Sequence, residues 1–219
     1  MKRVVISDLH IGTKFYKADK ILKFLKEEEY DELILAGDII DFIKIPTFTE
    51  KCLEIIQSFN DNKRVVYVVG NHDESLVSLI GKKIGNIEFV KRYDFECSNR
   101  KFRIEHGDEY DKGVIHNRIF IKILSVVQQI LENSMNFDLT TWWIEKDIKK
   151  HKLRSAIHIL RHHPEIDVFI MGHNHIPEAI IWVDAEQKIK TYINCGDWIT
   201  HQTYVTIIDG VARLKKFED

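Results

Sequence analysis

The sequence predicts an α/β fold, and three observations lead to this prediction. Short runs of β-branched and aliphatic residues alternate with amphipathic segments over the first 80 residues. Glycine, aspartate and asparagine residues mark the ends of these runs. Hydrophobic residues make up 44% of the 219 residues, enough for a substantial core. We therefore expect residues 1–219 to form one domain, with an insertion at about residues 112–152.

The first third of the chain predicts a βαβαβ unit. In chain order, the expected elements are a strand at Arg3–Ile6, a helix at Ala18–Glu29, a strand at Glu32–Ala36, a helix at Glu50–Phe59, a strand at Val65–Val69 and a short helix near Glu74–Ile80. The strands are rich in β-branched or aliphatic residues, whereas apolar residues recur at helical spacing in the helices. This alternation favours a largely parallel sheet that is covered on both faces.

The pattern changes after residue 80. The expected elements are strands at Ile87–Val90, Tyr93–Cys97, Phe102–Glu105 and Val168–Met171, a mostly helical stretch at Lys112–His151, a helix at Leu153–His162, and two hairpins, Ala179–Val183 with Lys190–Asn194 and Tyr204–Ile208 with Val211–Lys215. Ser98-Asn99 and Asp209-Gly210 are typical of tight hairpin turns. Pro164 should end the helix that precedes it, because proline cannot continue a helix.

Charge and cysteine content argue against several classes of protein. Lys and Arg number 32 against 34 Asp and Glu, a net charge of −2, which disfavours a general nucleic-acid binder. Cys52, Cys97 and Cys195 lie far apart without a CxxC pattern, which favours reduced thiols over disulfides or a structural zinc site. The N-terminus does not resemble a signal peptide, and no uncharged run could span a bilayer. We expect a cytoplasmic protein, for which peripheral contact with the inner face of the membrane stays open.

Polar residues gather where five of the predicted strands end. The five clusters are Asp8-Leu9-His10, Gly37-Asp38-Ile39-Ile40-Asp41, Gly70-Asn71-His72-Asp73, His106-Gly107-Asp108 and Gly172-His173-Asn174-His175. In open α/β sheets, ligands bind at the edge where parallel strands end. Each cluster alone is weak support, because Gly-Asp after a strand is commonly a turn or a helix cap. The five together favour a site at this edge.

The residue types in these clusters are those of a metal site. Asp and Asn supply oxygen ligands, and neutral imidazoles suit Mn, Fe, Zn, Co or Ni. Asp8 and His10 stand two apart, as do His173 and His175, so on an extended backbone each pair would point the same way. There are more ligands than one ion needs, which favours two ions roughly 3.5–4 Å apart. The glycines would let the backbone pass close to the ions; they are Gly37, Gly70, Gly107 and Gly172.

The five motifs, taken in this order, resemble the signature of the calcineurin-like metallophosphoesterases. The resemblance implies a four-layer α-β-β-α sandwich of two mixed sheets flanked by helices. It implies that Asp8, His10 and His175 bind a first metal, that Asn71, His106 and His173 bind a second, and that Asp38 bridges the two. His72 would stabilise the charged transition state or protonate the leaving oxygen, and Asp41 would orient the His72 ring. The reaction would use a hydroxide that bridges the metals, with Mn as the expected ion.

Within that family, the chain is most similar to the UDP-2,3-diacylglucosamine hydrolase branch. The resemblance rests on His106-Gly107-Asp108-Glu109-Tyr110-Asp111, on Trp142-Trp143-Ile144 and on Cys195-Gly196-Asp197-Trp198. It implies that residues 112–152 form a helical cap that takes acyl chains. The unusually apolar start of this insertion could instead face a membrane or another subunit, or could be an extra helical layer that packs on itself.

Two departures keep the substrate open. This chain has His72 where the lipid enzyme usually has arginine, and Ile176-Pro177 follows His175 where a basic residue is usual. The expected reaction is therefore hydrolysis of a phosphodiester or pyrophosphate bond, of UDP-2,3-diacylglucosamine or a related acylated or nucleotide substrate. A phosphodiesterase or nuclease of other substrate is the alternative, and a non-catalytic metal-binding scaffold is a third. The other histidines are expected at the surface or as caps, and His201 is the one expected near the site.

Overall fold

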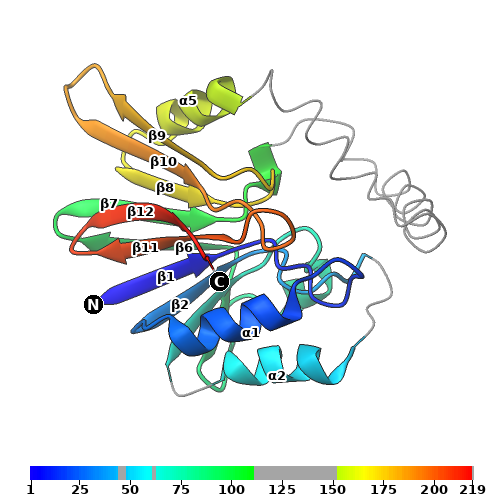
Figure 1. Ribbon diagram of the computed structural model, residues 1–219. Helices are drawn as coiled ribbons and strands as arrows, with labels where there is room; N and C mark the ends of the chain where they lie inside the picture. The colour runs from blue at the N-terminus through cyan, green and yellow to red at the C-terminus, as the bar shows by residue number, and fades with distance from the viewer. Residues whose placement is uncertain (44–47, 61–62, 111–151, 219) are drawn as a thin grey trace.

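The computed structural model describes residues 1–43, 48–60, 63–110 and 152–218. These residues form four layers, in which two stacked sheets lie between helices (Figure 1). The arrangement is the α-β-β-α sandwich that the resemblance implies. The predicted cap insertion, including Trp142-Trp143-Ile144, lies outside the described residues apart from its last residue.

The larger sheet has seven strands in the order β12-β11-β1-β2-β3-β5-β4. They are β1 (Lys2–Ile6), β2 (Glu32–Ala36), β3 (Arg64–Val68), β4 (Lys83–Ile84), β5 (Ile87–Val90), β11 (Thr203–Ile208) and β12 (Val211–Lys216). The central strands β1, β2, β3 and β5 are parallel, whereas β4, β11 and β12 pair antiparallel with their neighbours. The three strands of the predicted βαβαβ unit therefore end at the same edge.

The second sheet has five strands in the order β6-β7-β8-β10-β9. They are β6 (Arg92–Cys97), β7 (Arg100–Glu105), β8 (Val168–Met171), β9 (Glu178–Val183) and β10 (Ile189–Asn194). Strands β7, β8 and β10 are parallel, and the outer strands β6 and β9 are antiparallel to them. The motifs that follow β7 and β8 therefore also share one edge.

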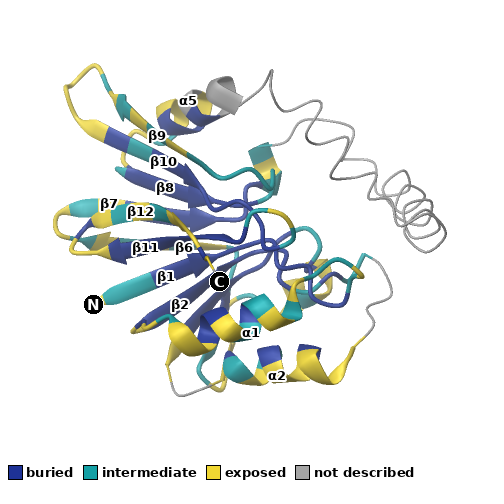
Figure 2. Cartoon of the chain, in the orientation of Figure 1, coloured by how far each residue is buried: buried dark blue, intermediate teal, exposed yellow. Residues whose placement is uncertain are grey.

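Helices cover the outer face of each sheet. Helices α1 (Ala18–Glu27) and α2 (Glu50–Ser58) pack on the larger sheet, and α5 (Lys152–His162) packs on the smaller one (Figure 1). Along β1 and β2 the side chains alternate, so that Val4 and Leu33 face the helices while Val5 and Ile34 face the other sheet. The larger sheet is thus covered on both faces, as predicted, by helices on one side and a sheet on the other (Figure 2).

The observed elements differ from the predicted ones mainly at their ends. Helix α1 stops at Glu27 because Glu28 is already extended, with φ −81° and ψ 118°. The short helix η1 (Glu74–Leu79) is a 3-10 helix, and a second one, η2 (Asp108–Tyr110), was not predicted. The two-residue strand β4 was also missed, being too short to show a period.

Both predicted hairpin turns are confirmed. Ser98 and Asn99 have φ of 51° and 60°, and Asp209 and Gly210 have φ of 49° and 77°. Left-handed backbone at both central residues is what a two-residue hairpin turn of type I′ requires. Among the described residues, no helix is both long enough and apolar enough to cross a lipid bilayer.

Candidate metal centre

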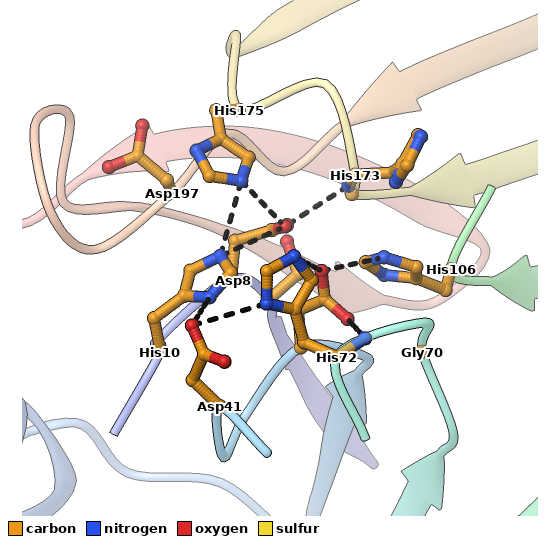
Figure 3. A network of polar contacts seen from close by, with 12 residues as sticks. Asp8, His10, Asp41, Gly70, His72, His106, His173, His175 and Asp197 are labelled. Atoms are coloured by element: carbon orange, nitrogen blue, oxygen red, sulfur yellow. Dashed lines mark hydrogen bonds and ion pairs between the residues drawn. The ribbon is translucent and has the colours of Figure 1, made fainter. Parts of the chain in front are cut away.

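The five predicted motifs meet at one edge of the sandwich, where β1, β2, β3, β7 and β8 end. The loops after β1 and β2 run side by side, because Asp8 N donates to Gly37 O (3.1 Å) and His10 N donates to Asp38 O (3.0 Å). The loops of the two sheets are also joined, since His173 N donates to the Asp8 carboxylate (3.1 Å). The other two motifs are joined as well, because Gly172 N donates to His106 O (3.1 Å) and His72 N donates to Asp38 Oδ1 (2.8 Å), so the five motifs form one cluster (Figure 3).

Most of the predicted metal ligands have left-handed backbones. Five of the seven have φ between 48° and 71°: Asp8, His10, Asp38, His173 and His175. A non-glycine residue in this region is strained, and such strain collects at functional sites. The expectation of an extended backbone at Asp8 and His10 is corrected, because both residues are left-handed, although their side chains do join one group of ligand atoms. His173 and His175 are left-handed too, and they join different groups of ligand atoms, so the expectation that they point the same way is wrong.

The first group consists of Asp8, His10 and His175. His175 Nε2 lies 3.2 Å from His10 Nε2 and 3.3 Å from Asp8 Oδ1. Asp8 Oδ1 is buried and accepts no hydrogen bond from a described residue. A buried carboxylate oxygen without a donor is costly, and a cation would satisfy it. Two imidazole nitrogens and a carboxylate oxygen that converge in this way fit a divalent ion.

The second group consists of Asp38, His106 and His173. His106 Nε2 lies 3.1 Å from Asp38 Oδ2. Asn71 Oδ1 joins this group, at 3.0 Å from His106 Nε2 and 3.2 Å from His173 Nδ1. His106 Nδ1 lies 3.0 Å from Ala36 O and can donate to it, which would leave Nε2 unprotonated toward the group. These donors also fit a divalent ion.

Asp38 lies between the two groups and also belongs to a third, with His10 and His72. Its Oδ2 atom lies 3.9 Å from His72 Nε2. Behind the two rings, Asp41 Oδ2 lies 3.2 Å from His72 Nδ1 and 3.6 Å from His10 Nδ1. The structure thus brings all nine predicted site residues into one cluster, with Asp38 near its centre.

The charges in the cluster shift one another's pKa values. Burial acts to lower the pKa of His72, but the negative charges of Asp38 and Asp41 outweigh it and raise the pKa to about 9. The pKa of His106 is likewise raised to about 10, because Asp38 outweighs burial. Burial would raise the pKa of Asp41, but His10 and His72 hold it far below its usual range. His72 and His106 therefore hold protons tightly, and a metal ion has to displace the proton of its ligand His106 to bind.

Two glycines keep space for the ligands, as predicted. Gly37 has φ +85°, and a Cβ atom there would overlap the ring of His106. A Cβ atom at Gly172 would overlap the carboxylate of Asp8. Glycine lets the backbone run directly against these side chains.

Asp73 has a structural place in the centre that the sequence reasoning did not assign. It is buried, and it accepts hydrogen bonds from Tyr67 Oη (2.8 Å) and Ile40 N (3.0 Å). Two longer bonds, each 3.3 Å, come from Ile39 N and Gly70 N. Asp73 therefore ties the loop after β2 to the loop after β3. The sequence feature that could have indicated this role is that Asp73 belongs to the same motif as Asn71 and His72 without being a predicted ligand.

The remaining described histidines lie elsewhere, apart from His201. His158 and His162 are exposed on α5, and His163 contacts Arg103. His201 Nδ1 donates to Asp197 Oδ2 at 2.6 Å, on the loop between β10 and β11. That loop reaches the metal centre, as the expectation for His201 suggested.

Comparisons with known proteins show the family of this chain. Residues 1–186 match the calcineurin-like phosphoesterase family. A UDP-2,3-diacylglucosamine hydrolase of Porphyromonas gingivalis is 22% identical over 266 residues, with 97% of this chain and 96% of that protein aligned. A protein of the same name from Vibrio cholerae is 25% identical over 236 residues, with 93% of each chain aligned.

A solved structure shows the same fold. It is YfcE, a phosphoesterase from E. coli, at 15% identity and a TM-score of 0.52, covering 97% of this chain and 91% of that one. Membership of the matched family implies divalent metal ions, and the groups of ligand atoms described above could hold them. The chain belongs to the calcineurin-like phosphoesterase family and is a phosphoesterase hydrolase.

Proposed function

We propose that this hydrolase binds two divalent metal ions and cleaves a phosphodiester or pyrophosphate bond. The observation that carries the proposal is the convergence of two groups of ligand atoms on either side of Asp38. Asp8, His10 and His175 would hold one ion, Asn71, His106 and His173 the other, and Asp38 both. Two such ions lower the pKa of a water molecule from about 15.7 toward neutrality and offset charge on the phosphoryl oxygens. Mn is our proposed ion, since nitrogen and oxygen ligands without thiolate suit it.

In this proposal His72 protonates the leaving oxygen and Asp41 positions it. The His72 side chain is 26% exposed, so it can meet a substrate, whereas Asp41 is buried behind it. Asp41, 3.2 Å from Nδ1, would accept the Nδ1 proton. Nε2, which faces Asp38, then carries the proton that is transferred.

For the substrate, we propose UDP-2,3-diacylglucosamine or a related acylated nucleotide. Both curated relatives named above carry that name and align over nearly their whole length. His72 and Ile176-Pro177 are the departures that favour a related substrate over the same one. The predicted cap at residues 112–152 would take the acyl chains and contact the inner face of the membrane, with the protein in the cytoplasm.

The test is hydrolysis by protein reconstituted with Mn, with bis(p-nitrophenyl) phosphate and UDP-2,3-diacylglucosamine as substrates. The wild type should turn over and bind two ions per chain. His72→Ala should lower kcat by roughly 10²–10⁴-fold, because it removes the proton donor, and should keep both ions. His162→Ala, which changes an exposed histidine on α5, is the matched control and should leave kcat unchanged. Protein that binds two ions but hydrolyses no phosphoester would contradict the proposal.

A further inference from the structure

Three hydrogen bonds fix the end of β10 and the loop that joins it to β11 to the metal centre. Trp198 N donates to Asp8 O (3.2 Å), and Ser7 Oγ donates to Gly196 O (3.1 Å). Asn194 Nδ2 donates to Gly172 O (2.5 Å), next to His173. These hydrogen bonds connect this part of the chain to segments of both sheets that carry predicted metal ligands.

This loop carries a buried carboxylate that holds a partly exposed histidine. His201 Nδ1 donates to Asp197 Oδ2 at 2.6 Å, and the other carboxylate oxygen accepts from Thr200 N. The Asp197 side chain is 2% exposed, whereas that of His201 is 34% exposed. A turn needs the bond to Thr200 but not the bond to the imidazole. Because Nδ1 is engaged, Nε2 is the ring atom that can meet a ligand, and it donates to an anionic oxygen when the ring carries both protons.

The position of the pair says which part of a substrate it can reach. Asp197 lies beside His175, on the opposite side of the cluster from His106 (Figure 3). A bare carboxylate there would repel an anionic substrate, and the imidazole of His201 offsets that repulsion. Asp197 therefore lies next to the first ligand group, beside the place where the proposed function would hold the reacting phosphoryl group.

We propose that His201, held by Asp197, binds an anionic oxygen of the substrate beyond the reacting phosphorus, as in the second phosphoryl group of a diphosphate. This inference rests on the proposed function, since it takes the reacting group to lie over the two ligand groups. His201 is a binding residue in this reading, and Asp197 positions it. The pair would thus select a diphosphate substrate over a simple phosphodiester.

The experiment compares UDP and UMP, which differ by one phosphoryl group, as competitive inhibitors of bis(p-nitrophenyl) phosphate hydrolysis. The wild type should bind UDP more tightly than UMP. His201→Ala should raise the Ki of UDP about tenfold more than the Ki of UMP, the loss expected for one charge-assisted hydrogen bond. Asp197→Asn should show the same bias more weakly, and His201→Gln, which keeps a donor, should recover part of the loss. His162→Ala is the control and should change neither Ki.

Three results would overturn the inference. They are a wild type that binds UDP no better than UMP, a His201→Ala variant in which both Ki values change equally or not at all, and loss of bound metal from that variant. Loss of bound metal would mean that Asp197 and His201 position the metal ligand His175 and do not bind substrate. Each of these is distinct from failure of the proposed function, which would appear as a wild type without turnover.

Discussion

Carboxylates are buried at both ends of the parallel strands, but the groups that surround them differ between the two ends. At the end where the strands begin, buried Glu32 meets Arg3 at 2.6 Å, Arg64 at 2.9 Å and Tyr93 Oη at 3.0 Å. Where the strands end, two imidazole nitrogens face each other at 3.2 Å, and Asp8 Oδ1 has no hydrogen-bond donor among the described residues. The first end is neutralised by the protein itself. The second is arranged for ions that the protein has to bind.

The largest expected effect comes from removing one carboxylate at each end. Asp38→Asn should lower kcat/KM by roughly 10³-fold or more and leave fewer than two ions bound, because Asp38 is shared by two ligand groups. Glu32→Gln should lower the free energy of unfolding by about 2 kcal/mol, because it leaves Arg3 without its buried partner. This loss of stability is smaller than that expected for a fully buried ion pair, because Arg64, the other partner of Glu32, has a side chain that is 47% exposed.

Activity, metal content and urea unfolding of both variants measure this contrast. If Asp38→Asn keeps two ions and full activity, Asp38 is not shared between them. If Glu32→Gln instead lowers metal content, the two ends are not the separate regions described above.

A second contrast uses two glycines with almost the same backbone angle. Gly37 has φ +85° and Gly81 has φ +82°, but a Cβ atom would overlap His106 at the first and meet nothing within 4 Å at the second. Gly37→Ala should weaken metal binding by roughly 10–100-fold, because it displaces a ligand ring without removing it. Gly81→Ala should cost about 1 kcal/mol of stability from backbone strain alone. Metal titration and thermal unfolding check both, and equal metal affinities would refute the steric explanation.

The sequence predicted much of this molecule because its signals are local. Strands β1, β2 and β3 are short apolar runs, and the polar residues after them stand at fixed positions in the chain. The parallel order of those strands then brings Asp8, Asp38 and Asn71 to one edge. The five motifs could be located before the structure for that reason, and the resemblance to the metallophosphoesterases implied which nine of their residues form the site.

The backbone geometry of the site could not be predicted in the same way. The sequence predicts that Asp8 and His10 continue an extended strand, and only the hydrogen bonds that their backbone N–H groups donate to the neighbouring loop show why they turn left-handed. The role of Asp73 depends on Ile40, 33 positions earlier, so no local pattern reveals it. The position of Asp197 beside the metal centre likewise depends on a long-range feature, the loop that connects β10 of the smaller sheet to β11 of the larger sheet.

The smallest expected effect is on the pH dependence of stability, which also separates the two ends. The pKa values of His72 and His106 are raised to about 9 and about 10 by Asp38, above the 6.5 of an ordinary histidine. A group whose pKa is raised by folding stabilises the fold when protonated. Its contribution is complete below about pH 6.5 and is lost as the pH rises through the folded value. Arginines stay protonated throughout this range, so the end at Glu32 should not contribute.

Protein stripped of metal should therefore lose thermal stability between about pH 6.5 and pH 8.5, since His72 and His106 release their protons more readily when the chain is unfolded. Protein loaded with Mn should not follow this decline, because bound metal requires neutral imidazoles and binds better as protons leave. The gap between the two melting temperatures should widen with pH by a few degrees. Thermal unfolding with EDTA and with excess Mn measures that gap. A metal-free protein whose melting temperature rises over this window would show that the histidines do not hold their protons as the geometry requires.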